Sequence, residues 1–129
     1  KTPIVVKISP DISKEQATQI SQILLKHEIE GIIVSNTTEG NREKLQSTSK
    51  HQKGGLSGKP LETISNQLIN IFYNLLKGKI EIIGVGGVDS GKSAYDKFLA
   101  GANFIQLYTG MVYQGPNIVG KIKKELKQI

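Results

Sequence analysis

The sequence predicts an α/β fold in which strands and helices alternate and the strands form a parallel sheet. Four short apolar runs recur along the 129 residues, and each is followed by a segment with apolar residues at helical spacing. Strands that alternate with helices in this way form parallel sheets with right-handed crossovers. The runs contain few polar residues, which is typical of strands that are buried on both faces.

The first strand is expected over residues 4–9 (IVVKIS), and the first helix over residues 13–28. Ser13 and Gln16 stand three residues apart, which is the spacing of a capping box at the start of a helix. Apolar residues then recur every three or four positions, which predicts one buried stripe along this helix.

The second strand is expected over residues 31–36 (GIIVSN). The polar stretch that follows, residues 37–58, is long for a loop without secondary structure in a compact domain, which points to function or to mobility. The second helix is expected over residues 61–77, because Gly78 fits the stop signal at its C-terminus.

The third strand is expected over residues 80–85 (IEIIGV), with a helix over residues 90–99 that Gly101 ends. The fourth strand is expected over residues 104–109 (FIQLYT), and Pro116 suits the first position of the last helix. Four such units make either a small open sheet or half of a (β/α)8 barrel, since a complete barrel usually takes about 250 residues.

The composition excludes several kinds of site. The chain has no cysteine, so it has no disulfide, thiolate metal site or cysteine nucleophile. Its two histidines, His27 and His51, are expected to be solvated, so no metal site is predicted. The net charge of +6 comes mainly from lysines spread along a chain with few aromatic residues, so no nucleic-acid partner is expected.

The ends of the sequence carry no targeting signal that we recognise. No apolar run approaches the roughly 20 residues that a membrane span needs. The sequence begins with Lys1 instead of Met and enters a strand almost at once, so we expect it to be a piece of a longer protein.

The residues that leave the four strands are small, polar and rich in glycine; they read KISPD, SNTT, GVGGVDSG and YTG. Ligands bind at the carboxyl ends of the strands in parallel sheets and barrels. Hydroxyls, one amide and many unhindered backbone N–H groups at these ends suit a phosphate and a polar planar ligand. Lys7 lies within the first strand, where its ammonium either meets an anion or polar cavity or reaches solvent from an edge strand.

Residues 86–93 (GGVDSGKS) fit the phosphate-loop pattern of nucleotide triphosphatases letter for letter. On that interpretation Lys92 contacts the phosphates and Ser93 binds Mg²⁺. A triphosphatase also needs a carboxylate at the end of another apolar strand to hold the metal, and the second and fourth strands end without one. Asp11 follows the first strand, but only after Pro10 and without the usual preceding apolar residues. The alternative is that the glycines of this stretch let the backbone approach a phosphate, together with residues 108–110, as in (β/α)8 barrels.

Six segments of the chain, in order, closely resemble the C-terminal half of dihydroorotate dehydrogenases: VKISPD, GIIVSNTT, GGLSGKPL, IIGVGGVDSG, GANFIQLYTG and VYQGP. The resemblance is closest to the quinone-linked, membrane-associated class. It implies that residues 1–129 are the last four βα units of an FMN-binding (β/α)8 TIM barrel.

Enzymes of this family oxidise dihydroorotate to orotate in de novo pyrimidine biosynthesis, and in this class the electrons pass through FMN to a quinone. The resemblance therefore implies FMN as cofactor, with dihydroorotate or orotate and a quinone as partners. It further implies a parent protein peripheral to the inner membrane, cytoplasmic or mitochondrial, and a soluble fragment.

The resemblance also implies binding roles for eight residues. It implies cofactor contacts for Lys7, Ser35, Gly58, Gly87, Tyr108 and Thr109, and substrate contacts for Asn36 and Thr37. Lys7 matches the lysine beside the flavin ring, where a cation stabilises negative charge on the reduced ring. Gly87, Tyr108 and Thr109 match the phosphate cradle. Lys92 and Ser93 then become ordinary residues of a first helical turn.

Two departures from the family pattern matter. After NTT this sequence continues EGNREKL, where the family usually has an apolar residue, Ser and Arg, so the role of Arg42 is open. The first half of the family's chain supplies the serine base and the quinone tunnel, and Ser57 matches a glycine turn instead of that base. We therefore assign no catalytic residue and expect no turnover from the isolated fragment.

A half-barrel leaves two sheet edges unpaired and an inner apolar face uncovered, so self-association is expected. Two other functions remain open on the sequence: a nucleotide triphosphate-binding protein that uses residues 86–93, and a non-catalytic folded relic that binds no ligand.

Overall fold

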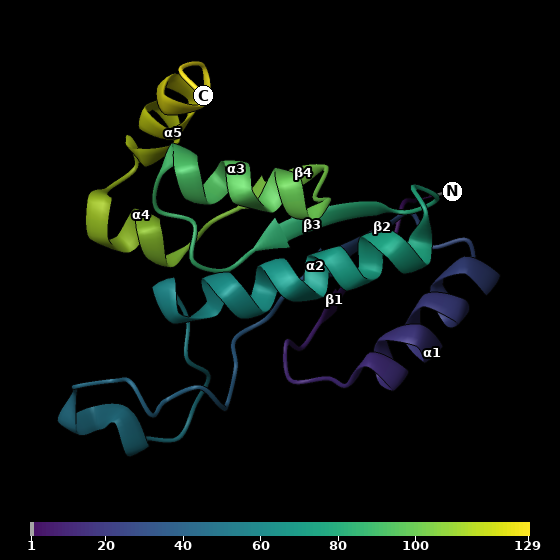
Figure 1. The fold of residues 1–129 in the computed structure, drawn as a ribbon, viewed down its shortest axis with the longest axis horizontal. Coiled ribbons are helices and arrows are strands. Elements are labelled where there is room, and N and C mark those ends of the chain that lie inside the picture. The colour runs from purple at the N-terminus through teal and green to yellow at the C-terminus, as the bar shows by residue number, and fades with distance from the viewer. Residues whose placement is uncertain (1) are drawn as a thin grey trace.

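A computed structural model describes residues 2–129 of the chain. Four parallel strands lie side by side in chain order, with helices packed along one side of them (Figure 1). The strands are β1 (Val5–Ile8), β2 (Gly31–Val34), β3 (Glu81–Val85) and β4 (Phe104–Gln106). The helices are α1 (Lys14–Lys26), α2 (Glu62–Leu76), α3 (Gly91–Ala100), α4 (Thr109–Gln114) and α5 (Ile118–Leu126). The α/β parallel architecture predicted from the sequence is confirmed.

Local signals define the helix ends where the sequence contains them. Ser13 and Gln16 form the predicted capping box at the start of α1. Ser90 caps α3, with Ser93 completing a second box. Gly101 ends α3 in the left-handed conformation, at a φ of 114°, which a glycine adopts without steric cost.

The main core lies between the sheet and helices α1 and α2. Side chains that alternate along the two central strands point into it, among them Ile32 and Ile82, and Phe72 of α2 packs against them fully buried. Strand residues of opposite parity lie on the other face, where Val5 is 42% and Phe104 57% exposed. The prediction of strands buried on both faces is therefore wrong for this chain, because helices cover only one face.

A second apolar cluster joins α3 to α5. Val88, Ala94, Ile118 and Ile122 are buried together there. Glu125 of α5 accepts a hydrogen bond from the backbone N–H of Gly91, at the first turn of α3. The C-terminal helix therefore braces the helix that follows the glycine-rich loop.

The structure corrects the sequence analysis near the C-terminus. The fourth strand ends at Gln106, and the unpredicted helix α4 begins at Thr109. A Cβ added to Gly110 would lie 2.4 Å from the Val88 carbonyl oxygen, so α4 packs closely on the loop after β3. A six-residue helix with a glycine in it carries no readable apolar stripe. Pro116 does not begin the last helix, which starts at Ile118.

The long polar stretch after β2 has little regular structure. It contains a 3₁₀ turn, η1 (Thr48–His51), and a single antiparallel bridge between Thr38 and Leu56, before a second 3₁₀ turn, η2 (Lys59–Leu61), leads into α2. Within residues 2–129, no helix is long and apolar enough to cross a membrane.

Candidate functional site

A pocket of about 450 Å³ lies at the carboxyl ends of the strands. Its size is typical of sites for small ligands and cofactors. All eight residues singled out in the sequence line it: Lys7, Ser35, Asn36, Thr37, Gly58, Gly87, Tyr108 and Thr109. Residues from all four strand ends and from the Gly58 turn thus meet around one cavity, although their individual roles stay predictions.

Glycines and free backbone donors form the pocket wall after β3 and β4. A Cβ added to Gly87 would lie 2.6 Å from Glu62 Cβ, and its φ is 76°, so only glycine lets this loop lie against α2. In the described part of the chain, the backbone N–H groups of Gly87, Thr109 and Gly110 donate no hydrogen bond. Unengaged N–H groups from the loop after β3 and from the first turn of α4 suit an anion such as a phosphate.

The Gly58 turn closes against this wall. Thr109 Oγ1 donates a hydrogen bond to Ser57 Oγ at 3.0 Å, across 52 residues of sequence. A Cβ added to Gly58 would lie 2.9 Å from Thr109 Cγ2, and the φ of Gly58 is 81°. Ser57 therefore helps to join two walls of the pocket.

The wall after β2 is made of polar side chains. The Asn36 backbone N–H donates to the Ile8 carbonyl at 2.7 Å, which ties this wall to β1. Asn36 Oδ1 accepts from the Thr37 N–H at 2.9 Å, and both side chains are exposed at the pocket. A Cβ added to Gly55 would meet Thr37 Oγ1 at 1.8 Å, so the returning loop passes directly over Thr37.

Lys7 lies on β1, which is one of the two edge strands of the sheet, and its side chain also lines the pocket. Both interpretations of this lysine therefore have a basis in the fold. Among residues 2–129, its ammonium forms no ion pair or hydrogen bond. It is a cation available to a ligand in the pocket.

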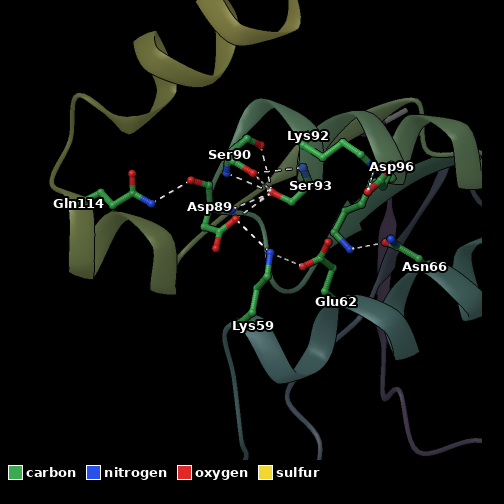
Figure 2. Close-up of polar contacts among 10 residues, drawn as sticks. Lys59, Glu62, Asn66, Asp89, Ser90, Lys92, Ser93, Asp96 and Gln114 are labelled. Carbon is green, nitrogen blue, oxygen red and sulfur yellow. Dashed lines mark hydrogen bonds and ion pairs between the residues drawn. The ribbon is translucent and has the colours of Figure 1, made fainter. Parts of the chain in front are cut away.

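Ionic contacts hold the outer rim, as Figure 2 shows. Lys59 Nζ lies 2.5 Å from Glu62 and 3.3 Å from Asp89, and Gln114 Nε2 donates to the Asp89 carbonyl at 2.8 Å. The hydrogen bond to Glu62 is the main reason why the pKa of Lys59 is raised. Burial opposes ionisation of Asp89, but hydrogen bonds and the charge of Lys59 outweigh it and lower the pKa of Asp89.

The residues of the phosphate-loop pattern do not face the pocket. Lys92 pairs with Asp96 one turn along α3 and points away from the Lys59 rim (Figure 2); its side chain is 73% exposed. Ser93 Oγ accepts hydrogen bonds from the backbone N–H groups of Asp89 and Ser90. Neither Lys92 nor Ser93 lines the cavity, so the geometry does not favour the triphosphatase interpretation. Both are residues of a first helical turn, as the resemblance implied.

Three residues to which the sequence analysis gave no role in the site help to organise it. Arg42 donates to backbone carbonyls of the loop it belongs to, those of Glu39, Lys50, Gln52 and Gly54. Asp11 accepts from Thr38 Oγ1 and from the Glu39 N–H at 2.8 Å, which joins the loops after β1 and β2. Lys97 of α3 is completely buried beneath the pocket. Of the three, only Lys97 could have been noticed in the sequence, because a lysine at a buried position of a predicted helix is unusual.

No metal centre is found in the described range, since no three His, Cys, Asp or Glu side chains of residues 2–129 cluster in a way that could hold an ion.

Comparisons with known proteins agree with this geometry. The family model described as dihydroorotate dehydrogenase matches residues 1–129. The dihydroorotate dehydrogenase (quinone) of Buchnera aphidicola is 47% identical over 124 residues, which cover 96% of this chain and 37% of that protein. The mitochondrial dihydroorotate dehydrogenase (quinone) of Mus musculus is 42% identical over 129 residues, 100% of this chain and 33% of that protein.

A solved structure gives the same result. The crystal structure of a ligand-free dihydroorotate dehydrogenase from Eimeria tenella superposes with a TM-score of 0.96 and 39% identity, covering 100% of this chain and 36% of that one. The four parallel strands and their helices are thus a portion of that family's TIM barrel. The chain spans about a third of the length of these relatives. It belongs to the dihydroorotate dehydrogenase family.

Proposed function

We propose that this chain is the C-terminal portion of a quinone-linked dihydroorotate dehydrogenase and that its pocket holds the phosphate and part of the ring of FMN. The observation that carries the proposal is the single pocket that eight family-matched residues line. The relatives named dihydroorotate dehydrogenase (quinone) supply the reaction and the electron acceptor. On this proposal residues 1–129 form one domain, the last four βα units of the barrel.

The pocket fits the chemistry of FMN. The N–H group of Gly87 in the loop after β3, and those of Thr109 and Gly110 in the first turn of α4, have no acceptor within the described protein, which suits a phosphate dianion. When bound, FMN would accept the hydride of dihydroorotate and pass the electrons to a quinone. The protein supplies binding, orientation and charge.

Each wall of the pocket has a distinct part in this proposal. The Lys7 ammonium, which no carboxylate of residues 2–129 neutralises, would stabilise negative charge on the ring system. Ser35 and Gly58 would contact the ring, and Tyr108 would contribute to the phosphate cradle. Asn36 and Thr37 present exposed polar groups at the pocket, where they would hydrogen-bond the polar edges of orotate.

The parent protein is proposed to act at the inner membrane, cytoplasmic or mitochondrial, since one relative is mitochondrial. The base that takes the substrate's proton is not assigned to these 129 residues, so the chain studied alone is proposed to bind FMN without turnover. Measurable dihydroorotate oxidation by the purified chain would contradict this.

The open face of the sheet favours self-association of the isolated chain. Val5 and Phe104 expose apolar surface on the face without helices, and β1 and β4 are edge strands in the described fold. Sedimentation velocity at increasing protein concentration should detect dimers or larger species. A compact monomer that binds no apolar dye would contradict the proposal.

The proposed cofactor is tested by a fluorescence titration of the purified protein with FMN, with ATP–Mg²⁺ in parallel. FMN should bind, and Thr109→Val should weaken it, because the added methyl would crowd Ser57 and Gly58 at the cradle and the hydrogen bond to Ser57 would be lost. Lys92→Met is the matched control, since Lys92 faces away from the pocket. ATP binding without FMN binding would favour the triphosphatase, and the absence of both would favour a relic.

A further inference from the structure

We propose that Lys97 is a positioning residue that acts through Ser65 to hold the carboxyl ends of β2 and β3 beneath the pocket. The part of this inference that concerns FMN affinity rests on the proposed function. The part that concerns the positions of the strand ends rests only on the contacts of Lys97. Lys97 is a buried cation that has no part in the binding scheme above, and this inference gives it a role in shaping the cofactor site.

The Lys97 side chain is built into the fold. It is fully buried, at 0% exposure, in the last turn of α3. Its Nζ donates to Ser65 Oγ at 3.0 Å and to Asn66 Oδ1 at 2.8 Å, both on α2. A Cβ added to Gly84 would lie 3.2 Å from Lys97 Cδ, so the glycine in β3 leaves room for the lysine stem. A buried ammonium is costly unless hydrogen bonds compensate it, and here they do.

Ser65 carries the contact from Lys97 to the strand ends. Its Oγ lies 2.7 Å from the Val85 carbonyl oxygen and 3.3 Å from that of Val34, which are the last residues of β3 and β2. Because Ser65 Oγ accepts from Lys97, its own proton is directed to these carbonyls. The next residues along the two strands are Ser35 and Gly86, and both line the pocket.

The position of Gly86 depends on the same serine. A Cβ added to Gly86 would lie 3.3 Å from Ser65 Cβ, so the turn that leads into Gly87 lies directly on this side chain. The Ser35 N–H also donates to the Val85 carbonyl at 3.2 Å, which links the two strand ends to each other. Ammonium, hydroxyl and two carbonyls therefore form one hydrogen-bonded chain below the cofactor pocket.

The charge of Lys97 changes within an accessible pH range. Burial lowers its pKa to about 8, although the negative charge of Glu62 on α2 opposes the shift. The strands β2 and β3 present uncharged groups to it, the carbonyls bonded to Ser65 and the Gly84 backbone. Asp96 on α3 is paired with Lys92 on the exposed side. Below the pKa the bond to Ser65 is charge-assisted, and above it that assistance is lost.

The test compares Lys97→Met, which keeps most of the stem without the charge, with Lys92→Met on the exposed side of the same helix. Amide hydrogen exchange at Ser35, whose N–H donates to the Val85 carbonyl, should be about tenfold faster in Lys97→Met, while core amides such as Ile69 change less. The FMN Kd should rise about tenfold, because displaced strand ends misplace the cradle. Lys92→Met should leave both unchanged.

The pH profile separates positioning from general packing. The wild-type FMN Kd should rise as the pH passes through about 8, and this rise should be absent in Lys97→Met. Ser65→Ala should reproduce the faster exchange at the strand ends, and the double variant should be no worse than Lys97→Met. Ser65→Ala also keeps the inference testable if circular dichroism finds Lys97→Met unfolded.

Two failures are distinguishable. If the wild type binds no FMN, the proposed function fails, and amide exchange alone then decides on Lys97. If exchange at Ser35 in Ser65→Ala and folded Lys97→Met equals that of the wild type, the inference is overturned. An unchanged FMN Kd and a wild-type pH profile in folded Lys97→Met would also overturn it.

Discussion

Two walls of the same pocket are built by different physics. The wall after β3 and β4 depends on close backbone approach, as the 2.6 Å between a Cβ on Gly87 and Glu62 Cβ indicates. The wall after β2 depends on hydrogen bonds that Asp11 accepts from a loop with little regular structure and that Arg42 donates within this loop. The first has no room for any side chain at its key position, whereas the second tolerates changes at the cost of local order.

The largest expected effect comes from filling the glycine wall. Gly87→Ala should lower the free energy of unfolding by about 3 kcal/mol and abolish FMN binding, because the methyl meets the Glu62 backbone and the residue has a positive φ. Gly78→Ala is the matched control: its φ is 74°, but no atom lies within 4 Å of the added Cβ. Denaturant unfolding should find only about 1 kcal/mol for the control. If both variants lose the same free energy of unfolding, the close contact with Glu62 does not contribute to the effect of Gly87→Ala.

The next largest effect is the change with pH in the free energy of unfolding that the buried Lys97 causes. Because the folded-state pKa of Lys97 is lowered to about 8, the unfolded chain binds more protons between pH 8 and 10.5. The penalty for burying the ammonium is full below pH 8 and is relieved as the pH rises. Relative to Lys97→Met, the wild type should gain up to about 3 kcal/mol across this window.

Denaturant melts of both proteins at several pH values provide the measurement, and the variant cancels the titration of all other groups. A wild type that loses stability relative to Lys97→Met across the same window would contradict the direction of the shift.

The polar wall should respond more weakly. Asp11→Ala removes the acceptor of Thr38 Oγ1 and of the Glu39 N–H, and we expect a loss of about 1–2 kcal/mol in the free energy of unfolding. Proteolysis within residues 39–54 should become faster, because the loop loses its tie to the end of β1. Glu15→Ala, on the exposed side of α1, provides a control. No change in proteolysis would assign the order of the loop to Arg42 alone.

The smallest effect is expected at the rim. Lys59 is 61% exposed, so its pairs with Glu62 and Asp89 should contribute less than about 1 kcal/mol. The raised pKa of Lys59 means that this contribution is present below pH 10.5 and is lost at higher pH. The lowered pKa of Asp89 means that its share is lost as the pH falls below 3.8. Thermal melts of the wild type and of Lys59→Met in low and high salt measure the contribution of these ion pairs. If the stability that Lys59→Met loses is the same in high salt as in low salt, the pairs are not surface ion pairs.

The glycines of the first wall could be predicted from local signals in the sequence, whereas the hydrogen bonds that hold the polar wall could not. Gly87, Gly101 and the Ser13 cap are local signals, which the backbone needs within a few residues of where they stand. The bonds of Asp11 to Thr38 and of Lys97 to Ser65 join residues 27 and 32 positions apart. Such pairings arise only once strands and helices are packed, so no spacing in the sequence encodes them.

The same reasoning explains the errors in the fold. The helix α4 depends on Gly110 fitting against the Val88 carbonyl, which is a contact between this helix and the loop after β3. The bare face of the sheet depends on which sides the helices cover, and apolar runs alone do not encode this. The pocket residues were found because family motifs supplied the pairings that local patterns lack.

The phosphate cradle is tested most directly by comparing the affinities of the purified protein for FMN and for riboflavin, which has the same ring system and no phosphate. If the free N–H groups of Gly87, Thr109 and Gly110 hold the phosphate, FMN should bind at least about a hundredfold tighter. Equal affinities for FMN and riboflavin would mean that these amides hold no phosphate, and would contradict the site proposed for this chain.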